Sequence, residues 1–356
     1  MKRLFIGGDS RSGGSLLARL LDCPGDYLSA PLESEYMEQR NLRAFSFSEF
    51  RRTHEATAVL ETEFVQKLFK FADGRLHSKQ RYDDELTDFS RDALERAFRA
   101  ELAQLPVGSL PEDVFRAIEL AFFRTLIGDQ LTPGAEPLLL TNHCSRTFVG
   151  DIGALFDVLG ESSFYLHTLR DPLSQIASWK HYSHLSQGKI THAVPEHFVD
   201  EAITRWYCSV YFAARNSQAY PDRYWVRSYS DLVTHPQAFL IRLCEQLGVP
   251  FVDSMLQPTY LGQQWSGNSS FGKLAASITD ETLTRYRKYL VSEEIDKIHN
   301  AVPDGVALLQ GLTDADASSR LMDYCAQNLP RQLDGEDPNH YFSRERYNQL
   351  FARTQF

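Results

Sequence analysis

The sequence has little that would suit a membrane, an oxidising compartment or a nucleic acid. No apolar run approaches the roughly 20 residues of a membrane span, and the three apolar residues 4–6 are too few for a secretory signal. The five cysteines are scattered, odd in number and without a C-x-x-C pair. We therefore expect reduced thiols in a cytoplasmic protein, and no zinc site. A net charge of −10 disfavours nucleic acid and anionic membranes as partners.

A glycine-rich segment follows the first apolar run. Residues 4–6 predict a short buried strand, residues 7–15 read GGDSRSGGS, and the leucines from residue 16 onward have helical spacing. A loop between a strand and a helix presents free backbone N–H groups and the positive end of the helix dipole to an anion. We expect a phosphate-binding loop here, the alternative being an ordinary strand-to-helix turn.

The loop lacks the lysine of nucleoside-triphosphate enzymes. Its glycines match the frame G-x-x-x-x-G-K-[ST], but Gly14 stands at the lysine position. Kinases and ATPases of that type use the lysine at the β- and γ-phosphates. Since Arg11 is the only cation in the loop, the segment favours a phosphate that carries a second group, with Arg11 beside the bridge between them.

A second segment predicts a ligand site at a strand end. Residues 163–169 alternate as a strand does, and Asp171 and Pro172 are a good helix start. Arg170 therefore lies at the carboxyl end of a strand, and Ser178 lies on the helix that follows. Open α/β sheets bind ligands at such ends.

Together these segments resemble the sulfotransferases that use 3′-phosphoadenosine 5′-phosphosulfate (PAPS). Arg11, Ser12, Gly13, Gly14 and Ser15 match the family's 5′-phosphosulfate loop, [KR]-S-G-T-[ST]. The match departs at Gly14, where the family usually has threonine, so one hydroxyl is missing while the backbone donor remains. The resemblance implies that this loop binds the 5′-phosphate and that Arg11 acts on the sulfuryl bridge.

The resemblance to this family spans residues 3–290 and includes three further segments. Arg170 and Ser178 match the family's 3′-phosphate pair in type and in spacing. Residues 225–236 resemble the segment whose tyrosine, here Tyr229, lies near the adenine. Residues 265–273 resemble the late loop that closes over the nucleotide in bacterial and tyrosyl-protein members. Its candidate nucleotide-binding residues are Ser269, Ser270 and Lys273.

The resemblance offers three candidates for the base. In tyrosyl-protein and many bacterial members a glutamate about twenty residues past the loop is the base, and Glu33 and Glu35 both lie near that distance. The alternative for both is a solvated acidic turn. His143 matches the histidine of the cytosolic K-T-H segment, but Thr141 replaces its lysine, and the alternative is a structural histidine. We favour Glu33 over His143, with Glu35 third, because the loop begins with arginine and that lysine is missing.

The predicted fold is α/β, a three-layer P-loop-like fold with a mostly parallel sheet of about five strands, each followed by a helix. We expect one domain over residues 1–356, with a helical insertion at 44–128 and a C-terminal tail at 330–356 that packs on the body or on another subunit. The strands predicted beyond the loop are residues 27–30, 138–143, 163–169 and 224–227. Later helices are predicted at residues 150–159, 196–219, 236–247, 283–290, 293–302 and 318–329.

The resemblance implies an enzyme that moves a sulfuryl group from PAPS to a hydroxyl, with an amine as the second choice. The acceptor is a small molecule or a peptide, PAP is the product, and no metal takes part. The insertion would form the acceptor side, and the tail is a candidate for homo-oligomer contacts. Two alternatives stay open: a P-loop kinase of small molecules, and a non-catalytic nucleotide-binding protein of the same fold.

Overall fold

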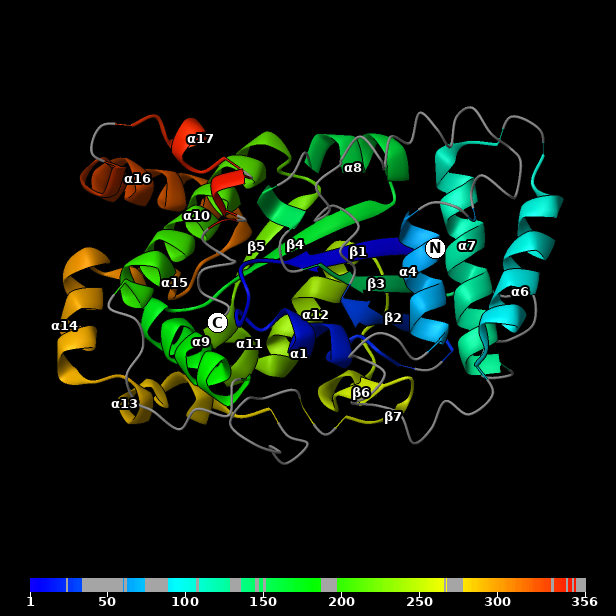
Figure 1. Ribbon diagram of the computed structural model, residues 1–356, viewed down its shortest axis with the longest axis horizontal. Helices are drawn as coiled ribbons and strands as arrows, with labels where there is room; N and C mark the ends of the chain where they lie inside the picture. The colour runs from blue at the N-terminus through cyan, green and yellow to red at the C-terminus, as the bar shows by residue number, and fades with distance from the viewer. Residues whose placement is uncertain are drawn as a thin grey trace.

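The centre of the computed structural model is a five-stranded sheet with helices on both faces (Figure 1). Every strand pair in it is parallel, and the order is β2-β3-β1-β4-β5. The strands are β1 (Lys2–Gly7), β2 (Tyr27–Glu33), β3 (Leu139–His143), β4 (Ser163–Leu169) and β5 (Tyr224–Ser228). This confirms the α/β prediction and puts β1, the strand before the glycine loop, at the centre.

The structure describes residues 1–23, 25–33, 60, 63–73, 89–106, 109–128, 136–144, 147–149, 152–186, 197–265, 267, 278–333, 336–343, 345–347 and 349. No helix within these ranges is both long and apolar enough to cross a membrane.

Alternation along the strands divides the core into two layers. Leu4 and Ile6 pack on one face with α1 (Gly14–Leu20), α11 (Tyr229–Thr234) and α12 (Pro236–Leu247). Phe5 packs on the opposite face, in a larger cluster with α8 (Ile152–Leu159) and α10 (Phe198–Ala219). Burial on both faces explains the continuous apolar run at residues 4–6 of β1.

The described part of the predicted insertion is helical. It contains α4 (Glu63–Ala72), α6 (Arg91–Gln104) and α7 (Pro111–Ile127), which gather at the side of the sheet shown on the right of Figure 1. The Ser90 side chain caps α6 by accepting the Ala93 N–H at 3.2 Å. That this region forms the acceptor side stays a prediction.

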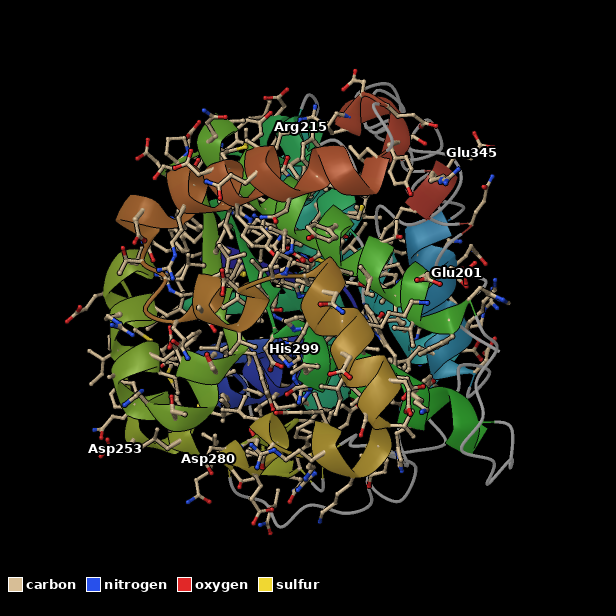
Figure 2. All side chains as sticks on the ribbon, turned by 90° about the vertical axis from the view of Figure 1, so that its left-hand side faces the viewer. Glu201, Arg215, Asp253, Asp280, His299 and Glu345 are labelled. Atoms are coloured by element: carbon tan, nitrogen blue, oxygen red, sulfur yellow. The ribbon has the colours of Figure 1, made fainter. Side chains whose placement is uncertain are left out.

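The C-terminal helices gather at the opposite side of Figure 1. The predicted helix at 283–290 is wrong in extent, because only α13 (Tyr286–Tyr289) forms there, after the short turn η4 (Asp280–Leu283). Helix α16 (Asp314–Leu333) is longer than the predicted 318–329 and lies against α10. Glu201 and Arg215 mark the two ends of α10 in Figure 2. The other elements after α10 are η3 (Asp253–Leu256), the hairpin β6 (Thr259–Tyr260) and β7 (Gln263–Gln264), α14 (Ser292–Ala301), α15 (Gly305–Leu309), α16 (Asp314–Leu333) and α17 (Pro338–Tyr341).

Candidate functional site

The predicted site residues converge because parallel strands end at one edge of the sheet. The glycine loop follows β1, Arg170 follows β4, Tyr229 follows β5, and His143 is the last residue of β3. Open α/β sheets bind ligands at this edge. Helix α9 (Pro172–Ser186), which follows Arg170, carries Ser178 toward the same loop.

The loop keeps a conformation that only some residues adopt. Gly13 has φ 101°, and a Cβ on it would lie 2.2 Å from Cδ2 of Tyr229, so a glycine is required at this close approach. Arg11 also has a left-handed backbone, with φ 69°. The Ser12 hydroxyl shares a 2.8 Å hydrogen bond with that of Thr168, which joins the loop to β4.

Arg11, Ser178 and Arg170 lie together. Arg11 Nε donates to Ser178 Oγ at 3.0 Å, and Arg170 Nη1 donates to the Arg11 carbonyl at 3.1 Å. All three residues are candidates for donor binding from the sequence. The fold brings Arg11 next to Ser178, although 167 positions separate them in the chain. Two guanidinium groups therefore lie at the glycine loop.

Arg170 is held on three sides. Its Nη2 donates to the Thr282 carbonyl at 2.9 Å, and its guanidinium lies 4.5 Å from the ring centroid of Tyr229. The Tyr229 and Thr282 hydroxyls are 3.0 Å apart and hydrogen-bonded. Nε of Arg170 is buried and has no hydrogen-bond partner within the described residues. A buried cationic donor with no partner among the described residues, beside the glycine loop, fits an anionic ligand group.

Two of the three base candidates are neighbours across the sheet. Glu33 and His143 are partners in the β2–β3 register. Burial, with a smaller effect from the charge of Arg19, lowers the pKa of His143 to about 3, so its imidazole is neutral near pH 7. The side chain of Glu33 lies outside the described part of the structure. So do four other predicted site residues, namely Glu35, Ser269, Ser270 and Lys273.

His143 also explains the departure at Gly14. A Cβ on Gly14 would lie 2.6 Å from Nε2 and 2.8 Å from Cδ2 of that histidine. The imidazole therefore occupies the space that a threonine side chain would need. Gly14 is the first residue of α1, and its backbone N–H stays in the loop.

Comparison with known proteins decides the family. A sequence model of the sulfotransferase family matches residues 3–253. This chain belongs to the sulfotransferase family. It is a transferase by that membership, and the match includes the loop, Arg170, Ser178 and Tyr229. No curated protein sequence matches the chain.

Three solved sulfotransferase structures are similar to this sulfotransferase at low sequence identity. The sulfotransferase domain of the Synechococcus PCC 7002 olefin synthase is 17% identical, with a TM-score of 0.49, over 88% of this chain and 95% of that domain. The sulfotransferase domain from the curacin biosynthetic pathway is 19% identical, with a TM-score of 0.48, over 84% and 96%. Sulfotransferase STF9 from Mycobacterium avium is 13% identical, with a TM-score of 0.36, over 92% and 76%. At these scores the structures carry no argument about activity or acceptor.

The loop of this sulfotransferase also contains a buried carboxylate, Asp9, which is not among the site residues predicted from the sequence. Asp9 accepts hydrogen bonds from Arg205, from the Tyr347 hydroxyl and from the Ser10 N–H. Burial raises the pKa of Asp9, and the nearby Arg205 charge opposes that effect. An acidic residue inside a loop expected to bind an anion is a sequence signal that a basic partner must lie close to it, although the sequence does not say which one.

Two other contacts of the loop were also missed. Gln175 Nε2, on α9, donates to the Ser10 carbonyl at 3.1 Å. Thr282 binds both Arg170 and Tyr229, as described above, and so brings the turn η4 to the site. Nothing in the local sequence of either residue indicates such a contact.

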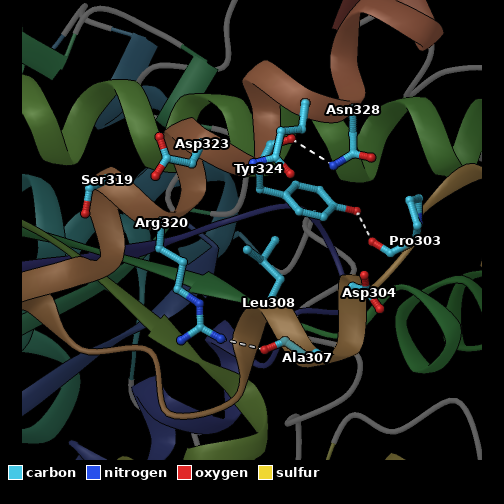
Figure 3. Close-up of a pocket in the computed structure, with 10 residues that line it drawn as sticks. Pro303, Asp304, Ala307, Leu308, Ser319, Arg320, Asp323, Tyr324 and Asn328 are labelled. Atoms are coloured by element: carbon cyan, nitrogen blue, oxygen red, sulfur yellow. Dashed lines mark hydrogen bonds between the residues drawn. The ribbon is translucent and has the colours of Figure 1, made fainter.

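A pocket of about 610 Å³ lies away from the loop, between α15 and α16 (Figure 3). There Tyr324 donates to the Pro303 carbonyl at 2.9 Å, and Arg320 donates to the Ala307 carbonyl at 2.6 Å. None of its lining residues belongs to the loop or to a strand end. Among the residues that the structure describes, no group of three or more His, Cys, Asp or Glu side chains is placed to hold a metal ion.

Proposed function

We propose that this sulfotransferase moves a sulfuryl group from PAPS to a hydroxyl of a small-molecule or peptide acceptor. The observation that carries the proposal is the pairing of two arginines at one phosphate loop. Arg11 Nε lies 3.0 Å from Ser178 Oγ, and Arg170 Nη1 lies 3.1 Å from the Arg11 carbonyl. An adenosine nucleotide with phosphate groups at both ends of its ribose suits two separate guanidinium groups better than ATP does.

The residues fit such a donor. The loop N–H groups together with Ser12, Gly13, Gly14 and Ser15 would hold the 5′-phosphate at the start of α1. Arg170 and Ser178 would hold the 3′-phosphate, for which the buried Nε of Arg170 is an available donor within the described residues. The ring of Tyr229 touches both Arg170 and Gly13, so an adenine near it would lie close to the phosphate groups.

Each part of the proposed transfer has a group that carries it out. PAPS supplies the sulfuryl group and is released as PAP, which keeps the electron pair of the broken sulfur–oxygen bond. Glu33 takes the proton of the acceptor hydroxyl as its oxygen bonds to sulfur, and His143 is the second candidate for this role. Arg11 and the loop N–H groups offset the negative charge that grows on the leaving phosphate oxygen.

A ligand series without metal tests the donor. In EDTA we expect PAP to raise the melting temperature much more than AMP does. Arg170→Ala should weaken PAP binding by roughly 10- to 150-fold, because a hydrogen bond to a charged group contributes about 1.5–3 kcal/mol. Arg320→Ala is the matched control, since Arg320 also donates to a backbone carbonyl but lies in the pocket of Figure 3.

The outcomes separate the alternatives. Equal shifts with PAP and AMP would remove the 3′-phosphate assignment. A larger shift with ATP and Mg²⁺ than with PAP would favour a kinase. Transfer of labelled sulfate from PAPS to any member of a hydroxyl panel supports the enzyme, and PAP binding with no transfer to any acceptor would favour a nucleotide-binding protein.

A further inference from the structure

The C-terminal segment of the chain reaches the phosphate loop. The Tyr347 hydroxyl donates to Asp9 Oδ1 at 2.7 Å, across 338 residues of sequence. Tyr347 is fully buried and lies outside the residues that the family model matches, 3–253. In Figure 2 the segment that carries Glu345 lies near the amino end of α10, which Glu201 marks.

Asp9 connects this segment to the loop backbone. The same Oδ1 accepts the Ser10 N–H at 2.7 Å and a hydrogen bond from Arg205 on α10. The Asp9 carbonyl accepts the Ser12 N–H at 3.2 Å. Asp9 therefore binds the backbone on both sides of Arg11, through its side chain at Ser10 and through its carbonyl at Ser12.

The groups that hold Asp9 are themselves fixed. The Arg205 guanidinium lies 4.1 Å from the ring centroid of Trp179, and the Tyr347 ring lies 5.5 Å from that of Phe148. Trp179 follows Ser178, which accepts the hydrogen bond from Arg11. The ring that packs against Arg205 and the hydroxyl that accepts from Arg11 thus belong to adjacent residues of α9.

We propose that Tyr347 is a positioning residue of the active site: through Asp9 it holds the phosphate loop in the conformation that directs Arg11. The proposal rests on the proposed function for its effect on catalysis, but the effect on the loop itself does not depend on it. The alternative is that Tyr347 only attaches the C-terminal segment to the body. The two roles differ in which part of the chain changes when the Tyr347 hydroxyl is removed.

Tyr347→Phe separates them, because the phenylalanine ring keeps the contact with Phe148 while the hydrogen bond to Asp9 is lost. Tyr324→Phe is the matched control. It also removes one hydroxyl from the C-terminal region, where Tyr324 donates to the Pro303 carbonyl. Hydrogen–deuterium exchange of the peptide covering residues 5–17, PAP affinity and kcat are measured for both variants and for the unmodified chain.

We expect the loop amides of Tyr347→Phe to exchange roughly tenfold faster, at the lower end of the range for a lost hydrogen bond to a charged group, because Arg205 and the Ser10 N–H remain on Asp9. We expect kcat to fall by a similar factor, with a smaller change in PAP affinity, since PAP lacks the group that Arg11 acts on. Tyr324→Phe should leave the loop exchange, kcat and PAP affinity unchanged.

Two results would overturn the positioning role. One is unchanged loop exchange and kcat in Tyr347→Phe. The other is faster exchange spread over α10 and α16 in both variants, with no excess in the loop. A chain that neither binds PAP nor transfers sulfate would instead refute the proposed function, and the loop exchange would still decide whether Tyr347 holds the loop.

Discussion

Gly14→Ala offers a sharp test of the contact between the loop and β3. In an isolated helix the change would stabilise α1 by up to about 1 kcal/mol, because alanine is the better helix former. Here the added Cβ would lie 2.6 Å from Nε2 of His143, well inside contact distance. Overpacking of this kind costs about 1–3 kcal/mol. We therefore expect a net loss of about 1–2 kcal/mol in the free energy of unfolding.

A double-mutant cycle isolates the contact. His143→Ala removes the ring, so Gly14→Ala in that background should be neutral or stabilising by up to about 1 kcal/mol. The coupling between the two positions should then be about 2 kcal/mol, within the range for residues in contact. Urea denaturation of the four proteins measures it.

The same double-mutant cycle can also refute the proposed contact between Gly14 and His143. Additive effects, or a gain in stability for Gly14→Ala with His143 present, would mean that the imidazole does not fill the space beside Gly14. The account of why this loop departs from the family's threonine would then be wrong.

Four further substitutions test the chemistry and the pH dependence. Arg11→Ala should lower kcat by on the order of 10²–10³ and change PAP affinity less; calorimetry showing collapsed PAP binding with unchanged kcat would make Arg11 a simple phosphate ligand. Glu33→Gln should lower kcat by roughly 10²–10⁴ with PAP binding intact. Because the pKa of His143 is lowered to about 3, His143→Asn should have a milder effect and leave any limb of the kcat profile between pH 5 and 8 in place; a near-inactive His143→Asn beside an active Glu33→Gln would reverse the assignment. Burial also lowers the pKa of His167 to about 3, so below pH 6.5 the unfolded chain binds a proton that the folded chain does not. Its contribution to stability should be complete above that pH and decline by up to about 1.4 kcal/mol per pH unit toward pH 3, and His167→Gln should flatten this slope in urea titrations; an unchanged slope would contradict it.

The local sequence was enough for the elements that carry the site. The strand before the loop, the helix after it, and the start of α9 follow from alternation, glycine and capping chemistry within a few residues. Asp171, for example, was predicted to cap α9, and its Oδ1 accepts the Ser174 N–H at 2.8 Å. The helix predicted at residues 283–290 was wrong in extent, because packing rather than periodicity decides whether so short a segment forms a helix.

The sequence by itself put His143 at the end of one strand and Arg170 after another, and hence predicted that both meet the glycine loop at one edge of an α/β sheet. It did not determine every strand end, because β2 runs to Glu33 and not to residue 30. The order β2-β3-β1-β4-β5 was decided only by the tertiary structure, and with it the contact between Gly14 and His143 and the opposition of His143 and Glu33. The hydrogen bond from the Tyr347 hydroxyl to Asp9 was likewise decided only by the tertiary structure. The physical reason is that a residue's own neighbours set its backbone conformation, whereas a buried charge or a crowded glycine is satisfied by whichever distant segment the packing brings to it.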